Sequence, residues 1–201
     1  MLRVGLTGGL ATGKSFVGEC LARRGCHLLK ADELGHAVLM PGGEAYDAVV
    51  EAFGPAILEA DGRINRRLLG QEVFSDPERL AKLNALVHPA VIRREELWFA
   101  QRAAHDPGGI AVVEAAILIE TGSYKRFDVI VLTVCSEQQQ IERAMRRDGL
   151  TRAEVEERLR RQMPLGEKRK YAQYVVDTSG EKVETEAQVD RLFLELRSRK
   201  A

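Results

Sequence analysis

Short apolar runs and amphipathic stretches follow one another along both ends of this chain. The apolar runs of strand length are residues 2–7, 26–29, 110–113, 129–134 and 174–176. These runs do not alternate strictly between polar and apolar positions, which is typical of strands buried on both faces of a parallel sheet. Apolar positions recur at helical spacing in residues 14–24, 137–147, 151–163 and 184–197. The pattern predicts an α/β fold with a parallel sheet between helices.

The middle of the chain departs from this rhythm. Residues 33–104 contain helical patterns interrupted by turn signals. Ser75 and Glu78 have the spacing of a capping box that opens a helix. His88 and Pro89 are predicted to end one helix and start the next, because proline is favoured at a first helical position. We therefore predict a mainly helical insertion on one side of the sheet.

Composition excludes several classes of protein. Hydrophobic residues make up 45% of the 201 residues, so a hydrophobic core with a solvated surface is expected. The 30 basic and 30 acidic side chains balance, so the formal net charge is zero. The charge balance argues against a dedicated nucleic-acid binder. No apolar run approaches the roughly 20 residues that span a bilayer, and the N-terminus has no signal-peptide pattern. We predict a cytoplasmic protein, either a monomer or a weak homo-oligomer.

The sequence GGLATGKS at residues 8–15 follows the first predicted strand and leads into the first predicted helix. Glycines at its two ends let the backbone wrap so that successive N–H groups point at phosphate oxygens. The N-terminus of the helix adds its positive dipole end. Lys14 is expected to bridge the β- and γ-phosphates and Ser15 to ligate Mg²⁺. The predicted nucleotide contacts are Gly9, Leu10, Ala11, Thr12, Gly13, Lys14, Ser15 and Phe16.

This phosphate loop predicts nucleotide binding but does not identify the reaction. The guanine-reading motif Asn-Lys-x-Asp is absent from the sequence, and so is a strand of four apolar residues ending in Asp-Glu, which many ATPase motors carry. A small ATP-dependent kinase is favoured. Two alternatives remain at this point: a kinase of another small acceptor such as a nucleoside monophosphate, and an ATP-binding regulatory module without transfer chemistry.

Asp32 follows the second predicted strand, at the sheet edge where doubly wound folds bind ligands. A carboxylate there could accept the proton of an acceptor hydroxyl and orient it toward the γ-phosphate. Asp32 could equally cap the following helix, with Glu33 in the first turn. The spacing alone leaves both readings open.

Arginines are dense between residues 138 and 170, and most of them interleave with glutamates as on a solvated helix face. Arg143 and Arg147 lie four residues apart on one face of a predicted helix. We interpret this pair as cations of a mobile lid that covers the migrating phosphoryl group. His88 could bind a ligand phosphate or cap a helix, whereas the other histidines show no ligand-like spacing and are read as structural or surface residues.

Taken in order, these motifs resemble the dephospho-coenzyme A kinase family over nearly the whole chain. The landmarks are Gly5-Leu6-Thr7-Gly8-Gly9, Ala31-Asp32, Phe53-Gly54, Asp61-Gly62, Arg66, Leu69, Val73-Phe74, His88-Pro89, Ile117-Leu118-Ile119-Glu120, Arg143, Arg147-Asp148, Gln162, Val175-Val176 and Gly180. The resemblance implies transfer of the ATP γ-phosphate to the ribose 3′-hydroxyl of dephospho-CoA, with Mg²⁺.

The resemblance also implies three parts and a set of roles. Residues 1–32, 106–136 and 172–201 would form the nucleotide-binding core, residues 33–105 a helical subdomain for the CoA acceptor, and residues 137–171 a helical lid. Dephospho-CoA would dock between the core and the helical subdomain. Asp32 would orient the acceptor hydroxyl, and Arg66 and His88 would lie near the acceptor. Lys14, Arg143 and Arg147 would act on the phosphates, and Thr178 would lie near the adenine.

Four positions depart from the family pattern. Ala116-Ile117-Leu118 stands in place of the usual Pro-Leu-Leu, which is a mild packing change. Lys30 stands where the family usually has an aspartate, so a shared role of two acids with Asp32 is not expected. Gln173 replaces the second residue of a usual Ala-Asp pair, and Thr178 replaces a usual asparagine. The reaction is still expected, because backbone groups often read adenine.

Overall fold

The computed structural model describes residues 1–74 and 76–199 and divides into two compact units. One unit, here the sheet unit, contains Met1–Lys30 and the chain from Arg102 onward. The other, here the inserted unit, is Ala31–Gln101. Residues 137–171, which the sequence assigns to a lid, belong to the same compact unit as the sheet.

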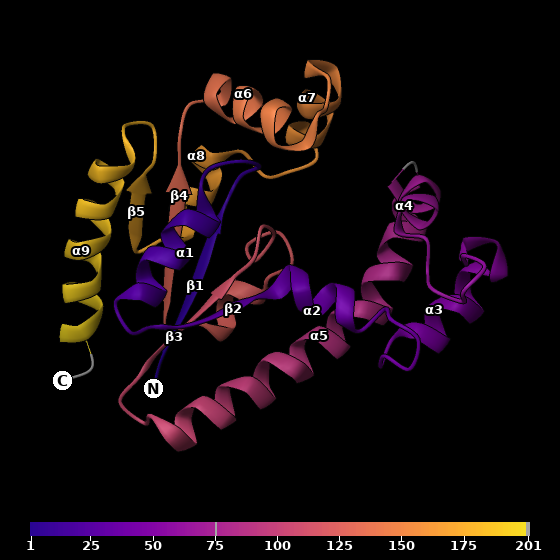
Figure 1. The fold of residues 1–201 in the computed structure, drawn as a ribbon, viewed down its shortest axis with the longest axis horizontal. Coiled ribbons are helices and arrows are strands. Elements are labelled where there is room, and N and C mark those ends of the chain that lie inside the picture. The colour runs from indigo at the N-terminus through magenta and orange to yellow at the C-terminus, as the bar shows by residue number, and fades with distance from the viewer. Residues whose placement is uncertain (75, 200–201) are drawn as a thin grey trace. The chain divides into compact units, whose positions relative to one another are not determined.

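Five parallel strands form a single sheet in the order β2-β3-β1-β4-β5 (Figure 1). The strands are β1 (Leu2–Gly8), β2 (His27–Lys30), β3 (Ile110–Glu114), β4 (Val129–Val134) and β5 (Tyr174–Asp177). In the central ladder Leu6 lies opposite Glu114 on one side and Val131 on the other. The predicted α/β class and parallel sheet are confirmed. All five strands also lie at or within one residue of the predicted runs, because each falls on a short and mainly apolar run.

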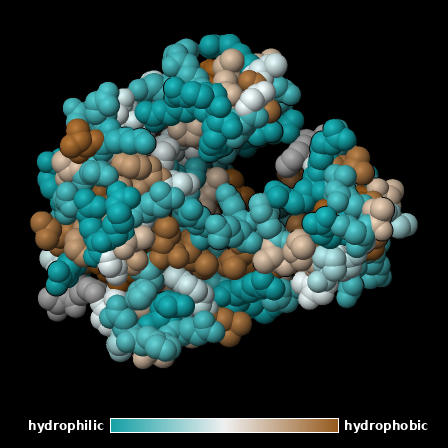
Figure 2. Space-filling model, in the orientation of Figure 1, coloured by the Kyte–Doolittle hydropathy of each residue, from teal (hydrophilic) through white to brown (hydrophobic). Residues whose placement is uncertain are grey.

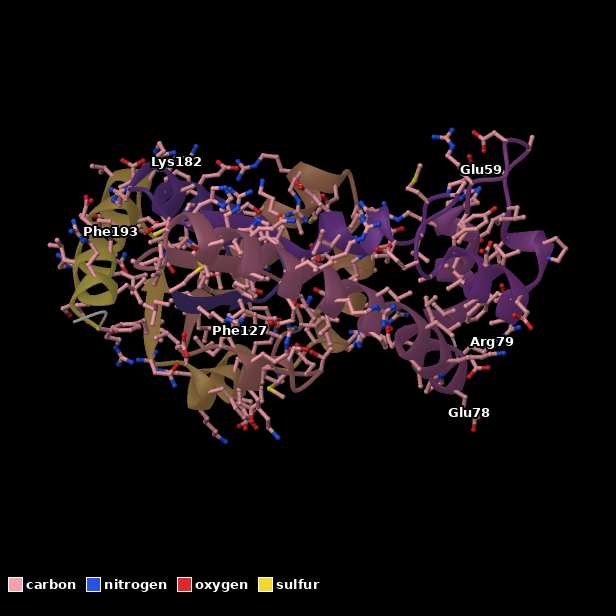
Figure 3. The ribbon with its side chains drawn as sticks, turned by 90° about the horizontal axis from the view of Figure 1, so that it is seen from below. Glu59, Glu78, Arg79, Phe127, Lys182 and Phe193 are labelled. Carbon is pink, nitrogen blue, oxygen red and sulfur yellow. The ribbon has the colours of Figure 1, made fainter. Side chains whose placement is uncertain are left out.

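Helices α1 (Lys14–Arg23) and α9 (Lys182–Ser198) pack together on one face of the sheet (Figure 1). Buried β-branched side chains of the strands meet Val17 and Leu21 of α1 and Val189 and Leu196 of α9 in the main core. Phe193 of α9, labelled in Figure 3, packs at the edge of this core. The opposite face of β1 is in contact with residues that follow β3, because a Cβ at Gly5 would lie 3.0 Å from Leu118.

Two helices with well-formed caps follow β4. Helix α6 (Glu137–Asp148) opens with a capping box between Ser136 and Gln139, and α7 (Arg152–Arg160) with the predicted capping box between Thr151 and Glu154. Helix α7 ends at Arg160 rather than near Met163, so the chain leaves the helix before Pro164. The short helices α8 (Leu165–Lys168) and η3 (Arg169–Tyr171) then lead into β5.

The inserted unit is helical, as the sequence predicts, and has its own core. Its elements are α2 (Ala31–Ala37), α3 (Tyr46–Phe53), η1 (Pro55–Ile57), α4 (Arg66–Phe74) and α5 (Pro77–His105), of which the last continues into the sheet unit at Arg102. Val38, Val49, Ile57, Val73 and Ala90 are buried together. Arg79, labelled in Figure 3, holds its guanidinium 5.9 Å from the ring of Phe53 and completes the packing at one edge.

Two expectations for this region need revision. Helix α5 is continuous through Pro89, so the prediction that His88-Pro89 separates two helices is wrong. An interior proline removes one backbone hydrogen bond, and the helix continues beyond it with Ala90 and Phe99 buried. The Ser75 part of the predicted capping box lies outside the described residues. The start of α5 is capped by Asp76, whose carboxylate accepts hydrogen bonds from the backbone N–H groups of Glu78 and Arg79.

The surface is polar over most of the face in Figure 2, with small separate hydrophobic areas. The most exposed large apolar side chains are Val183, Leu194 and Leu97, at 64–70% exposure. Among the described residues, no helix is both long enough and apolar enough to cross a bilayer.

Candidate functional site

The phosphate loop joins β1 to α1 and takes the strained backbone that its sequence requires. Gly13 has φ 79° and serves as the residue before the helix, and Ala11 has φ 54°. The left-handed region is costly for an alanine, so the loop stores local strain at the point where backbone N–H groups must converge. A side chain at Gly13 would also lie 3.3 Å from Thr178. Glycine at this position therefore serves both the backbone angle and the close approach of a second loop.

The ammonium of Lys14 lies along the loop. Its Nζ donates to the carbonyl of Gly9 at 2.8 Å and to that of Gly8 at 3.4 Å. These carbonyls hold the ammonium over the loop that would wrap the phosphates, at the N-terminal turn of α1. The position agrees with the predicted phosphate-binding role, since only rotations of the side chain separate a carbonyl-bound from a phosphate-bound ammonium.

Ser15 lies next to a carboxylate that the sequence reasoning did not single out. Its Oγ donates to Oε1 of Glu114 at 2.6 Å, while Oε2 of Glu114 is buried and has no partner. Glu114 ends β3, directly after four buried apolar residues. The signal was available, because the rule that drew attention to Asp32 applies equally to a carboxylate at the end of residues 110–113. A hydroxyl and a half-satisfied carboxylate thus meet beside Lys14.

Threonines hold the loop from the other side. The hydroxyl of Thr178 donates to the carbonyl of Thr12 at 2.9 Å and is itself buried. The hydroxyl of Thr12 pairs with that of Thr133 on β4 at 2.8 Å. Thr178, which replaces the usual family asparagine, therefore binds the phosphate loop through its hydroxyl. The departure is accommodated as a positioning contact.

The two arginines of α6 have different partners. Arg143 donates to the hydroxyl of Thr178 at 3.1 Å and to its carbonyl at 2.7 Å, so it is fixed to the loop after β5. Arg147 forms a two-bond pair with Asp148 at 2.7 and 2.9 Å. The hydrogen bond from Arg147 lowers the pKa of Asp148. Arg147 is 61% exposed, so its guanidinium is accessible for a second anionic partner.

Asp32 lies in the first turn of α2, two residues after the last residue of β2, and it belongs to the inserted unit. Because α2 begins at Ala31, Asp32 is inside the helix rather than at its cap position. Lys30, the departure from the family pattern, ends β2 with its ammonium 3.5 Å from the carboxylate of Glu19 on α1. Lys30 thus has a partner within the sheet unit.

Arg66 and Asp32 both act on the charge of a histidine of the inserted unit, His36. Burial lowers the pKa of His36, the guanidinium of Arg66 lowers it further, and the carboxylates of Asp32 and Glu33 act in the opposite direction. Arg66 and Asp32 are therefore both close to His36, a residue that spacing alone left as structural or surface. His88 lies farther along α5, where burial lowers the pKa of its imidazole.

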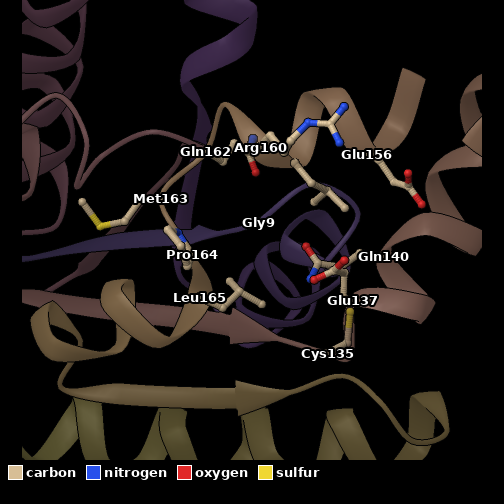
Figure 4. Close-up of a pocket in the computed structure, with 11 residues that line it drawn as sticks. Gly9, Cys135, Glu137, Gln140, Glu156, Arg160, Gln162, Met163, Pro164 and Leu165 are labelled. Atoms are coloured by element: carbon tan, nitrogen blue, oxygen red, sulfur yellow. The ribbon is translucent and has the colours of Figure 1, made fainter. Parts of the chain in front are cut away.

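A cavity of about 610 Å³ lies beside the phosphate loop within the sheet unit (Figure 4). Its lining includes Gly9, Gln140 of α6, Arg160 of α7 and the segment after α7. Gln140 is 5% exposed, and its Oε1 has no hydrogen-bond partner. A Cβ at Gly9 would lie 2.5 Å from this oxygen, so a larger residue at the second loop position would require the Gln140 side chain to move.

Gln173, the third departure, extends the sheet. Its side-chain oxygen accepts from the backbone N–H of Ile130 at 2.7 Å, and its own N–H donates to the carbonyl of Ile130 at 3.0 Å. The residue thereby aligns β5 with β4 just before their ladder begins. The substitution is explained by this structural contact.

Comparison with known proteins agrees with these features. The chain matches the dephospho-CoA kinase family over residues 2–184. It is 40% identical over 191 residues to a dephospho-CoA kinase of Geobacter sulfurreducens, covering 94% of this chain and 96% of that relative. A dephospho-CoA kinase of Aquifex aeolicus is 37% identical over 196 residues, 98% of each chain. A crystal structure of a Thermus thermophilus protein superposes with a TM-score of 0.86 at 32% identity, covering 96% of each chain. With the phosphate loop, Asp32 and the arginines of α6 inside the matched region, the chain belongs to the dephospho-CoA kinase family.

Proposed function

We propose that this chain transfers the γ-phosphoryl group of ATP to the ribose 3′-hydroxyl of dephospho-CoA, producing CoA and ADP in the last step of coenzyme A biosynthesis. The observation that carries the proposal is the family match over residues 2–184 combined with an intact phosphate loop. The threonines that hold the loop support the proposal, because Thr12 pairs with Thr133 and Thr178 donates to the carbonyl of Thr12.

The nucleotide is bound by the sheet unit. Backbone N–H groups of residues 9–16 surround the β- and γ-phosphates, and Lys14 exchanges its loop carbonyls for phosphate oxygens. Arg143, held at the loop after β5 by its two hydrogen bonds to Thr178, is the first of two proposed cations over the transferred phosphoryl group. Arg147, which is paired with the adjacent Asp148, is the second and supplies positive charge for the γ-phosphoryl oxygens.

Ser15 and Glu114 fit a Mg²⁺ that accompanies ATP. Mg²⁺ in phosphoryl-transfer sites typically takes one or two protein oxygens, several waters and phosphate oxygens. The short Ser15–Glu114 hydrogen bond and the unpartnered Oε2 of Glu114 provide such oxygens in one place. The described residues contain no cluster of three or more His, Cys, Asp or Glu that could hold a metal ion by themselves, so the phosphates and waters would complete the shell. When bound, the ion neutralises charge on the β- and γ-phosphates.

Glu114→Gln is expected to raise the Mg²⁺ concentration needed for half-maximal activity by about tenfold, because the variant keeps the shape of the side chain and loses its charge. Activity would be partly restored by excess Mg²⁺. The measurement is a Mg²⁺ titration of initial rates at fixed ATP, with Glu19→Gln on α1 as the matched control. An unchanged Mg²⁺ midpoint for Glu114→Gln would contradict the assignment.

The acceptor chemistry needs a group that takes the proton of the 3′-hydroxyl. Asp32 is the proposed base, and its carboxylate orients the hydroxyl for in-line attack on the γ-phosphorus. The oxygen–γ-phosphorus bond forms as the bond to the β-γ bridging oxygen breaks, and ADP leaves with that oxygen. Arg66 and His88, both in the inserted unit, are proposed contacts of the acceptor.

The test is ADP release from Mg-ATP with dephospho-CoA, AMP, CMP or no acceptor in parallel reactions. ADP release stimulated by dephospho-CoA alone, with CoA as the second product, is the expected result. Stimulation by AMP or CMP instead would identify a nucleoside monophosphate kinase. Tight ATP binding without acceptor-dependent ADP release would identify a binding module. Either of these results would overturn the proposal.

A further inference from the structure

Lys168 is fully buried, with no exposed side-chain surface. Its ammonium has three acceptors: the carbonyl of Ala116 at 2.9 Å, the carbonyl of Gly8 at 3.4 Å and the carboxylate of Glu120 at 2.8 Å. A lysine ammonium has three donors, so each donor has one acceptor. Removing a charge from water is costly unless it is paired and hydrogen-bonded, and this site meets both conditions.

The acceptors of Lys168 come from two segments that lie far apart in the sequence. Gly8 is the last residue of β1 and the first residue of the phosphate loop, whereas Ala116 and Glu120 follow β3. The carbonyl of Gly8 also accepts from Lys14 at 3.4 Å. Two ammonium groups therefore share the carbonyl at the entrance of the phosphate loop.

Lys168 ends a segment that leaves helix α7, residues 162–168, which we call the strap. The side-chain oxygen of Gln162, at the start of the strap, accepts from the backbone N–H of Leu10 at 2.8 Å. The backbone N–H of Met163 donates to Glu120 at 3.2 Å. The strap thus holds the phosphate loop at Leu10 and at Gly8, on both sides of Gly9.

The strap also joins the loop to the helices that carry the arginines. Leu10 and Ala11 pack against buried Ile141 of α6 and Val155 of α7. Gln162 and Pro164 form part of the cavity wall that faces Gly9 in Figure 4. Contacts of both kinds, apolar and polar, therefore fix one short stretch of the loop relative to α6 and α7.

We propose that Lys168 and Gln162 are positioning residues of the phosphate loop. Lys168 remains hydrogen-bonded to the Gly8 carbonyl when the Lys14 ammonium moves to the phosphates. Gln162 remains hydrogen-bonded to the Leu10 N–H. The loop therefore has the same conformation in the empty and the nucleotide-bound states. A loop held in its binding conformation does not lose conformational freedom when the nucleotide binds. This inference rests on the proposed use of the loop for ATP.

The experiment compares Gln162→Leu and Lys168→Met with the wild type and with Gln138→Leu. Gln138 is an exposed glutamine of α6 whose side chain pairs with Glu142 and Arg152, so it provides the same substitution away from the loop. Four quantities are measured: the calorimetric Kd for Mg-ADP, the KM for ATP, the KM for dephospho-CoA and the Tm.

We expect Gln162→Leu to raise the Kd for Mg-ADP and the KM for ATP about five- to tenfold, as loss of one hydrogen bond would. Lys168→Met should raise both by about tenfold or more, because its bonds are charge-assisted. The KM for dephospho-CoA should stay within about twofold of the wild-type value, since a lost hydrogen bond at the loop is worth far less at a distant site. Gln138→Leu should resemble the wild type in all four quantities.

A purely structural role predicts a different outcome. A lower Tm with unchanged Kd for Mg-ADP and unchanged KM for ATP in Gln162→Leu would overturn the proposal, even if Lys168→Met fails to fold. Failure of the proposed function is recognised separately: a wild type that binds Mg-ADP without phosphorylating dephospho-CoA still allows the strap to be judged by ADP affinity. A wild type that binds no Mg-ADP would overturn both.

Discussion

Replacing Asp32 by asparagine is expected to lower kcat by about 10²–10⁴-fold, the range that a positioned general base contributes. Asparagine has nearly the same shape but cannot take the proton of the 3′-hydroxyl. Asp32 belongs to the inserted unit and the phosphate loop to the sheet unit, so the affinity for Mg-ATP should stay close to the wild-type value. Initial rates at saturating substrates and a calorimetric Kd for Mg-ADP measure the two effects separately.

Glu33→Gln is the matched control, because Glu33 is the neighbouring carboxylate in the first turn of α2. It removes the same charge one residue away and should leave kcat within about threefold of wild type, the scale of a modest change in the local field. Turnover of Asp32→Asn equal to wild type would remove Asp32 from the mechanism. A large loss in both variants would indicate that the helix needs its acidic first turn for another reason.

Replacing Lys14 by methionine should have an effect of comparable size on a different parameter. The loss of one preorganised cation at the transferred group typically costs about 10²–10³-fold in rate. Methionine keeps the length of the stem and removes the charge, and the two loop carbonyls of Gly8 and Gly9 lose a donor. We expect kcat/KM for ATP to fall by about this factor, measured at saturating dephospho-CoA.

Lys182→Met provides the control for removal of a lysine. Lys182 begins α9 and holds its ammonium 5.6 Å from the ring of Phe16, next to the same helix that follows the phosphate loop. Its removal should leave kcat/KM for ATP within about twofold of wild type, because an exposed cation–π contact is worth about 0.5–1 kcal/mol of local packing. An equal loss in both variants would mean that the effect of Lys14 is general electrostatic attraction rather than contact with phosphate.

The sheet and the phosphate loop could be predicted because their signals are local. Each strand falls on a short and mainly apolar run, and GGLATGKS at residues 8–15 carries its backbone requirements in its own glycines. The helix boundary at Thr151 was equally local, since a capping box spans only four residues. Patterns of this kind depend on neighbours in the sequence, and the fold did not override them.

The contacts that complete the site join residues far apart in the sequence. Glu114 meets Ser15 across 99 positions, Gln162 meets Leu10 across 152, and Lys168 meets Gly8 across 160. Composition and local spacing do not indicate which distant residues will pair. Gln162 was therefore named only as a landmark of the family resemblance, and Lys168 was not predicted. The error at Pro89 has the opposite origin: a local helix-breaking signal did not end the helix, which continues with Ala90 and Phe99 buried after the proline.

The order of the strands has a consequence for synthesis on the ribosome. Strand β1 pairs with β3 and β4, both of which follow the whole inserted unit in the chain. At about 5–20 residues per second, β1 therefore waits several seconds for its first partner, while the inserted unit, which has its own core, can already compact. The phosphate loop leaves the ribosome first. It reaches its final structure among the last elements, when β5 and Thr178 leave the exit tunnel and Thr178 can bond to Thr12. Nascent chains stalled at increasing lengths should acquire affinity for ATP in one late step.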